Sequence, residues 1–327
     1  MDNLLLDRLF DLGENSSTHY PLFPGVYMTS ETKTTDNSGP VISIIIPAYN
    51  EGEGIIQVLQ GIYSQPYLAD AEIVVVDDGS TDNTSAVVAR FPGVRLVTHH
   101  MNKGYGATIS TGVKASTGKY VIWFDADWQY RVEDLVRLAQ VMVEKDLDWC
   151  VGARGKGSYQ ERERVFGKFI LSLAVRIVTL KKVQDYNSGL RGFRRQVINR
   201  YLHMLPSGFG ASTTMTLIML ERGYYGEDIP IIQRKRIGKS SVKIFRDGIR
   251  TLIIILRIFL LFKPMRFFGS AGILFILGGL IYGVPKAINT RTGFPVLAAL
   301  VVILGLQAFF FGLLADQVSQ SRLERFE

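Results

Sequence analysis

The chain has 327 residues, 47% of them hydrophobic and 20% charged, with a net charge of +7 and one cysteine, Cys150. This length suffices for one large domain or two smaller ones, and two uncharged stretches at 267–285 and 294–315 could each cross a bilayer as a helix. The composition therefore excludes a wholly soluble enzyme, the single cysteine excludes an internal disulfide, and the sequence contains no groove-reading motif that would indicate nucleic acid as a partner.

The first 40 residues are polar and rich in turn formers, and we expect an N-terminal extension (1–40) with little structure and no chemistry. From residue 41 onward, short apolar runs alternate with segments of helical period. This alternation predicts βαβ units and an α/β domain with a mostly parallel sheet over residues 41–243. The expected strands are 41–46, 72–76, 94–98, 120–124 and 149–152, and the expected helices are 51–64, 82–90, 105–115 and 131–145.

The C-terminal part is organised around its apolar segments. Residues 244–266 are apolar but contain Arg250 and Arg257, which predicts an amphipathic interfacial helix and not a span. Two transmembrane helices are expected within 267–315, followed by a cytoplasmic tail at 316–327. Most of the positive charge precedes the first span, which predicts that the catalytic domain and both termini are cytoplasmic. The basic segments are expected to meet anionic head groups or a phosphate-bearing substrate.

Acidic residues follow the predicted strands. Ligands of parallel sheets bind outside the carboxyl ends of the strands, so these residues are candidates for a site. Five carboxylates at one edge of a sheet require a divalent metal, or a sugar and base rich in hydrogen-bond donors. Gln129 adds a neutral oxygen, and if the chain stays extended after the strand, its side chain would lie on the same side as those of Asp125 and Asp127. The acids are Glu51, Asp77, Asp78, Asp125 and Asp127.

Three other motifs in the sequence resemble the signatures of known sites. A second D-x-D, Asp146-Leu147-Asp148, precedes a strand and is predicted to be a solvated surface feature. Gly238-Lys239-Ser240 resembles the end of a phosphate-binding loop, but the required upstream glycine is replaced by Gln233. A dinucleotide fingerprint beginning at Gly104 fails because its sixth position is Ile109. The strand-end acids therefore remain the strongest signal of function.

Six motifs, in a fixed order along the chain, carry a more specific resemblance. They are 41–51 (VISIIIPAYNE), 72–80 (EIVVVDDGS), 102–104 (NKG), 125–129 (DADWQ), 185–191 (DYNSGLR) and 236–240 (RIGKS). Together these motifs resemble family 2 glycosyltransferases with the GT-A fold, a Rossmann-like α/β domain. Within that family they are most similar to polyisoprenyl-phosphate glycosyltransferases of the dolichyl-phosphate mannose synthase type. The resemblance covers about residues 41–245.

The resemblance implies roles for individual residues. Asp125, Asp127 and Arg154 would be catalytic, and Asp127 with Gln129 would hold Mg²⁺ or Mn²⁺ on the donor diphosphate. The nucleotide sugar would be bound by Pro47, Ala48, Tyr49, Glu51, Asp77, Asp78, Lys103, Gly104, Asp125, Ala126, Arg236 and Lys239. The acceptor phosphate would be bound by Arg154, Lys168, Ser172, Ser188 and Arg191.

The implied reaction is metal-dependent, inverting transfer of a hexose from a UDP- or GDP-type nucleotide sugar to a polyisoprenyl phosphate, dolichyl or undecaprenyl, at the cytoplasmic membrane face. A phosphate monoester is largely dianionic at pH 7, because its second pKa is about 6, so this acceptor needs little help from a general base. Two alternatives stay open: a glycosyltransferase acting on another membrane lipid hydroxyl, and a non-catalytic membrane scaffold with this fold. The expected partners are the donor, the lipid phosphate and the bilayer, and a homo-oligomer is left open.

Overall fold

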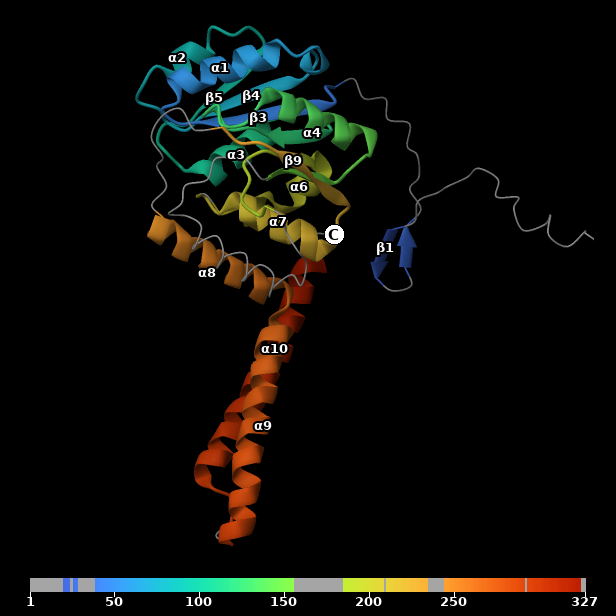
Figure 1. Ribbon diagram of the computed structural model, residues 1–327, viewed down its shortest axis with the longest axis vertical. Helices are drawn as coiled ribbons and strands as arrows, with labels where there is room; N and C mark the ends of the chain where they lie inside the picture. The colour runs from blue at the N-terminus through green and yellow to red at the C-terminus, as the bar shows by residue number, and fades with distance from the viewer. Residues whose placement is uncertain are drawn as a thin grey trace, which may run out of the picture. The chain divides into compact units, whose positions relative to one another are not determined.

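A computed structural model describes residues 20–23, 26–28, 39–155, 185–208, 210–234, 244–291 and 293–324. The chain divides into two units, residues 1–38 and 39–327. In the first unit, β1 (Tyr20–Phe23) and β2 (Val26–Met28) pair as an antiparallel hairpin, drawn in blue in Figure 1. The expectation of little structure in residues 1–40 is wrong for this hairpin. Its sequence signal is the Pro24-Gly25 pair between two short apolar runs.

The second unit contains a seven-stranded sheet in the order β5-β4-β3-β6-β8-β7-β9. Every neighbouring pair is parallel except the two that involve β8, which runs antiparallel to both β6 and β7. The predicted α/β class with a mostly parallel sheet is therefore confirmed. Strands β8 and β9 were not expected, because one is short and charged and the other contains Pro230. The strands are β3 (Ile42–Ala48), β4 (Glu72–Asp77), β5 (Val94–Thr98), β6 (Tyr120–Trp123), β7 (Trp149–Arg154), β8 (Arg191–Arg194) and β9 (Gly226–Ile231).

Helices cover both faces of this sheet (Figure 1), with α1, α2 and α4 on one face and α3, α6 and α7 on the other. The four helices predicted before residue 146 agree with the structure to within two residues at each end. The helices are α1 (Gly52–Tyr63), α2 (Thr84–Val88), α3 (Tyr105–Ala115), α4 (Val132–Glu144), α6 (Arg195–Tyr201) and α7 (Ala211–Arg222), with short 3₁₀ helices η1 (Pro66–Leu68) and η3 (Leu202–Met204).

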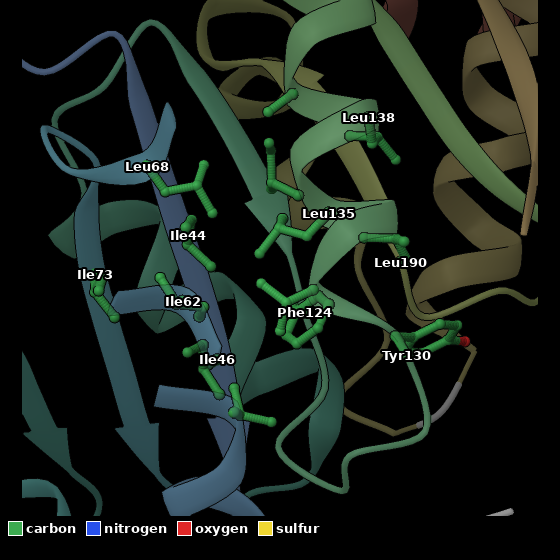
Figure 2. Close-up of a cluster of buried hydrophobic side chains, with 14 of the residues drawn as sticks. Ile44, Ile46, Ile62, Leu68, Ile73, Phe124, Tyr130, Leu135, Leu138 and Leu190 are labelled. Carbon is green, nitrogen blue, oxygen red and sulfur yellow. The ribbon is translucent and has the colours of Figure 1, made fainter. Parts of the chain in front are cut away.

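The central strands are buried on both faces. Ile44 and Ile46 of β3 point into the core beneath α1 and α4, where Figure 2 shows them near Phe124 and Leu135, whereas Ile45 joins the core on the opposite face. This division follows from the alternation of side chains along a strand. It also explains why the chain is a nearly continuous β-branched run from residue 41 to 46. Such packing holds the carboxyl ends of β3, β4 and β6 in fixed positions at one edge of the sheet.

Helix α8 (Ile244–Phe262) is amphipathic, and its apolar side is wider than the part that is buried. Ile255, Ile258 and Phe262 are buried in the core beneath α7, with exposures of 1%, 4% and 8%. Immediately after the helix, Lys263 forms an ion pair with the buried Glu221 of α7. The helix leaves other large apolar side chains exposed, and these are Ile249, Leu252, Ile253 and Leu256.

Two long helices complete the described chain, α9 (Pro264–Thr290) and α10 (Val296–Glu324). Their apolar segments, Pro264–Thr290 and Val296–Ser321, have mean hydropathies of 2.0 and 2.5 and are long enough to cross a membrane. The two helices approach closely where glycines face each other, and a Cβ atom on Gly272 would lie 2.7 Å from the carbonyl oxygen of Gly305. The expected pair of apolar C-terminal helices that could span a membrane is therefore confirmed.

Candidate active site

Asp77, at the end of β4, holds the loop that follows it. The carboxylate is 1% exposed, and Oδ1 accepts a hydrogen bond from the backbone N–H of Ser80 at 2.9 Å, while Oδ2 accepts one from the Ser85 hydroxyl. Ser80 in turn accepts the N–H of Asn50, which joins this loop to the loop after β3. Tyr49 is 43% exposed beside that connection, whereas Ala48 is 2% exposed. Of these predicted donor-site residues, Tyr49 presents the most surface to a ligand.

Asp78 is likewise enclosed by protein donors. Its two oxygens accept the backbone N–H groups of Lys103 and Gly104 at 2.9 and 2.8 Å, and the Nδ1 atom of His99 lies 2.6 Å from Oδ1. Only 3% of the residue is exposed. These contacts bring the predicted residues Asp78, Lys103 and Gly104 together, and they show the carboxylate organising the loop before α3.

The chain after β6 turns sharply and does not continue extended. Trp128 has a positive φ of 59°, and Oδ1 of Asp127 accepts the backbone N–H of Gln129 at 3.1 Å. An extended chain was the condition for placing 125, 127 and 129 on one side, and that condition is not met. Instead, the turn itself brings the backbone of Gln129 to the Asp127 carboxylate. Ala126 is packed against α1, where a Cβ atom on Gly54 would lie 2.5 Å from its carbonyl oxygen.

The segment after β9 closes against this turn. Gln233 donates from Nε2 to the side-chain oxygen of Gln129 at 3.0 Å, and the backbone N–H of Arg234 donates to the carbonyl of Gln129 at 2.9 Å. The guanidinium of Arg234 lies over the Trp128 ring, 5.1 Å from its centroid. No sequence motif indicated this role for Gln233, apart from its place in the segment that leads to 236–240. Arg236 and Lys239 lie outside the described residues.

The donor set at this turn fits a magnesium-type ion. Asp127 would supply a carboxylate and Gln129 an amide oxygen. Within the described ranges there is no cluster of three or more His, Cys, Asp or Glu side chains that could hold a metal. Mg²⁺ is ordinarily bound by one or two carboxylates together with substrate phosphates and water, and not by an all-protein cage. A small set of oxygen donors at a strand end therefore suits an ion that arrives with a diphosphate.

Arg154 ends β7 and is paired with Asp185. Nε lies 2.5 Å from Oδ2 and Nη2 lies 2.7 Å from Oδ1, and Asn187 adds a backbone N–H to Oδ1 at 3.1 Å. The side chains of the pair are 17% and 9% exposed. Burial alone would raise the pKa of Asp185, but the hydrogen bonds and charge of Arg154 hold it below its usual value. Sequence reasoning missed this role for Asp185, although the residue lies in one of the quoted motifs.

Arg191 and Ser188, two of the predicted acceptor residues, lie in the interior with exposures of 0%. Arg191 donates from Nε to the carbonyl of Ser188 at 2.8 Å, and from Nη1 to the carbonyl of Ser212 at 2.6 Å and the hydroxyl of Thr216 at 2.9 Å. A buried guanidinium needs such acceptors. These contacts join the 185–191 segment to α7 and enclose the Arg191 guanidinium in the interior. Lys168 and Ser172 lie outside the described residues.

The second D-x-D lies at the opposite edge of the sheet, at the amino end of β7. The Asp146 side chain is 62% exposed and is paired with Lys119 and Arg194. Its Oδ1 also accepts the hydroxyl of Tyr120 at 2.5 Å. These contacts agree with the expectation of a solvated surface feature, and they separate this motif from Asp125 and Asp127.

Comparison with known proteins agrees with this geometry. Residues 43–202 match the family model for glycosyl transferase family 2, and residues 263–321 match that of the GtrB C-terminal hairpin. The chain is 33% identical over 169 residues to an undecaprenyl-phosphate 4-deoxy-4-formamido-L-arabinose transferase of Sodalis glossinidius, covering 50% of this chain and 51% of that protein. It is 28% identical over 181 residues to a UDP-N-acetylglucosamine–dolichyl-phosphate N-acetylglucosaminyltransferase of Methanococcus voltae, covering 48% and 71%. The chain thus spans about half the length of the first of these relatives.

The fold is also similar to that of glucosyl-3-phosphoglycerate synthase from Mycobacterium tuberculosis, with a TM-score of 0.56 and 20% identity over 68% of this chain and 79% of that one. This likeness concerns the fold alone, and it agrees with the seven-stranded sheet and its helical layers. The α/β domain of this chain therefore has the GT-A fold, its residues 43–202 match glycosyl transferase family 2, and the protein is similar to the polyprenyl-phosphate glycosyltransferases.

Proposed function

We propose that the protein transfers a hexose from a nucleotide sugar to a polyisoprenyl phosphate at the cytoplasmic face of a membrane. The observation that carries this proposal is the combination, in one structural unit, of a family 2 domain with two helices long enough to span a bilayer. The relatives support it, because their names give undecaprenyl and dolichyl phosphates as acceptors. The donor is a hexose carried on UDP or GDP, and a panel of donors distinguishes the two nucleotides.

In this proposal the donor lies at the ends of β3, β4 and β6. Tyr49 and Asp125 contact the nucleotide, and Asp127 with Gln129 would hold Mg²⁺ or Mn²⁺. Solved structures of the M. tuberculosis synthase contain Mn²⁺ or Mg²⁺ together with UDP, which supports this choice. The ion, when bound, supplies positive charge to the departing diphosphate. The side chains of this chain orient the donor and exclude water around it.

The acceptor phosphate reaches the sugar from the side of Arg154. A phosphate oxygen forms a bond to the anomeric carbon while the bond from that carbon to the nucleoside diphosphate breaks. One direct displacement of this kind inverts the configuration at the sugar. Arg154 offsets the repulsion between the two phosphate-bearing substrates, and Asp185 holds its guanidinium in place. The dianionic acceptor makes a dedicated general base unnecessary.

The experiment uses membranes that contain the full chain, a panel of UDP- and GDP-sugars, and undecaprenyl or dolichyl phosphate. We expect a lipid-linked sugar of inverted configuration, formed with Mn²⁺ or Mg²⁺ and lost when EDTA removes the metal. Transfer to a ceramide or diacylglycerol hydroxyl in place of the lipid phosphate would instead identify the protein as a glycosyltransferase that acts on another membrane lipid hydroxyl. If no donor of the panel gives a product, the result would favour a non-catalytic membrane scaffold with this fold.

A further inference from the structure

Tyr105 connects helix α3 to the first acid of the strand-end pair. It is the first residue of α3, and its hydroxyl donates a hydrogen bond to Oδ1 of Asp125 at 3.1 Å. Burial raises the pKa of Tyr105 well above its ordinary value, and the charge of Asp125 raises it further. The phenol therefore stays protonated, as a donor to the carboxylate, throughout the physiological pH range.

The start of α3 is held on two sides. The Asp78 carboxylate accepts the N–H groups of Lys103 and Gly104, and Gly104 has a φ of +94°, which residues with a Cβ atom rarely adopt. From the other side, the carbonyl of Ser207 accepts the N–H of Gly106 at 2.9 Å, and a Cβ atom on Gly104 would lie 2.5 Å from that oxygen. The ring of Tyr105 is therefore mounted on a rigid helix terminus.

The other oxygen of Asp125 is confined by Gly189. Any Cβ atom on Gly189 would overlap Oδ2 of Asp125, so the carboxylate fits here only beside a glycine. The N–H of Gly189 donates to the hydroxyl of Tyr130 at 2.6 Å, which holds that segment in place. Burial, and then the charge of Asp125, raise the pKa of Tyr130 to about 12, so this phenol is also neutral. Asp125 thus lies between a hydrogen-bond donor and a close backbone contact.

We propose that Tyr105 is a positioning residue that holds the Asp125 carboxylate in the orientation that binds the nucleotide-sugar donor. The inference rests on the proposed function and extends it to a residue outside the strand-end acids. It connects two motifs that are far apart in sequence, since Asp78 holds the start of α3 and α3 carries Tyr105 to Asp125. Preorganised side chains bind better because no orientation has to be selected when the ligand arrives.

The test compares Tyr105→Phe with Tyr120→Phe in the full-length protein. Both changes remove a phenol hydroxyl that donates to an aspartate, and Tyr120 acts on Asp146 at the opposite edge of the sheet. For Tyr105→Phe we expect roughly tenfold weaker calorimetric binding of UDP or GDP with Mn²⁺ and a similar rise in donor KM, as suits one charge-assisted hydrogen bond. The KM for lipid phosphate should not change. Tyr120→Phe should leave all three values at wild-type levels.

A double-mutant cycle with Asp125→Asn separates positioning from a general structural effect. If Tyr105 acts through Asp125, the double variant should bind nucleotide no worse than Asp125→Asn alone. Full additivity, or equal behaviour of Tyr105→Phe and Tyr120→Phe, would overturn the inference while leaving the proposed function intact. Wild-type nucleotide binding by Asp125→Asn would remove the donor-site assignment, and this inference would fall with it.

Discussion

At the scale of single residues, the acids at the carboxyl edge differ in what their oxygens contact. Asp77 and Asp78 accept hydrogen bonds from backbone N–H groups of the loops that follow β4 and β5, so both carboxylates stabilise the conformation of those loops. Asp127 is also buried, but its Oδ1 accepts only a local hydrogen bond, from the N–H of Gln129 within the turn after β6. Loss of a charge therefore has different consequences at these positions.

The first prediction concerns Asp127. We expect Asp127→Asn to lower transfer about 100-fold or more and to weaken Mn²⁺-dependent nucleotide binding, because the change removes the one negative charge that the proposed ligand pair offers to the cation. Transfer assays and calorimetry with and without Mn²⁺ measure both effects. Asp148→Asn is the matched control, since Asp148 pairs with Arg194 at the opposite edge. Equal losses in the two variants would contradict the placement of the site.

The second prediction concerns Arg154. Removing it leaves the nearly buried Asp185 without a counter-ion, so Arg154→Ala should lower the free energy of unfolding by about 3 kcal/mol. Donor binding should remain close to wild type, whereas transfer to lipid phosphate should fall. Thermal unfolding, nucleotide calorimetry and transfer kinetics measure the three quantities.

The double variant Arg154→Ala/Asp185→Ala separates stability from function at this pair. We expect it to regain much of the lost stability, because no charge is left unpaired, but not the lost transfer. Recovery of transfer in the double variant would show that the pair matters only for folding. A fall in donor affinity as large as the fall in transfer would assign Arg154 to the donor diphosphate instead.

At the scale of elements, α8 combines a wide apolar side with exposed charge. Part of that side packs in the core beneath α7 through Ile255 and Ile258, whereas Leu252 and Ile253 are 42% and 56% exposed. Arg257 is also exposed. A surface helix of a soluble domain buries its apolar stripe, so the exposed apolar residues of α8 indicate contact with another apolar phase. Since α9 begins two residues later with an apolar span, that phase is expected to be the bilayer.

The third prediction tests this contact. A polarity-sensitive fluorophore on Ile253→Cys, in a Cys150→Ser background, should show blue-shifted emission in vesicles and be quenched by lipids labelled near the head group. The same probe on the exposed Lys114→Cys of α3 should show neither effect. Identical emission at the two positions would mean that α8 faces water. Its exposed apolar residues would then need another explanation.

At the scale of the whole second unit, the apolar hairpin is joined to the catalytic domain by specific contacts. Glu221 of α7 pairs with Lys263 between α8 and α9, and the Ser319 hydroxyl of α10 donates to the carbonyl of Leu261. Phe259 and Phe267 pack edge to face across the same turn, with ring centroids 6.3 Å apart. These contacts attach the membrane segments to the face of the sheet that carries α7.

The fourth prediction concerns topology. With two spans and basic residues before the first, a cysteine at Asn289 should react with an impermeant maleimide from outside, and one at Ser321 should react only after permeabilisation. Ser321 is chosen because the neighbouring Ser319 is buried. Burial raises the pKa of Cys150 to about 12, so the native thiol gives little background. Labelling at Ser321 from outside would indicate an odd number of spans and a different role for α8.

Much of the fold could be predicted because its signals are local. The β-branched run in β3 and the helical periods between residues 51 and 145 depend on neighbours along the chain. The placement of Asp77 and Asp125 at one edge follows from the rule that parallel strands end together. By contrast, β8 and β9 lack such a pattern, because a short charged strand and a strand with proline are stabilised by their partners in the sheet.

The sequence by itself determined the class of the domain, the strand-end acids and the two apolar spans, since these depend on periodicity and on the length of uncharged runs. Only the tertiary structure decided which polar and charged side chains are paired with or enclosed by other parts of the protein. Arg154 meets Asp185 across 31 residues, Arg191 is enclosed by α7, and Tyr105 reaches Asp125 from another helix. A side chain's exposure and partners arise from segments that are distant in sequence, and their packing is what separates a binding residue from a supporting one.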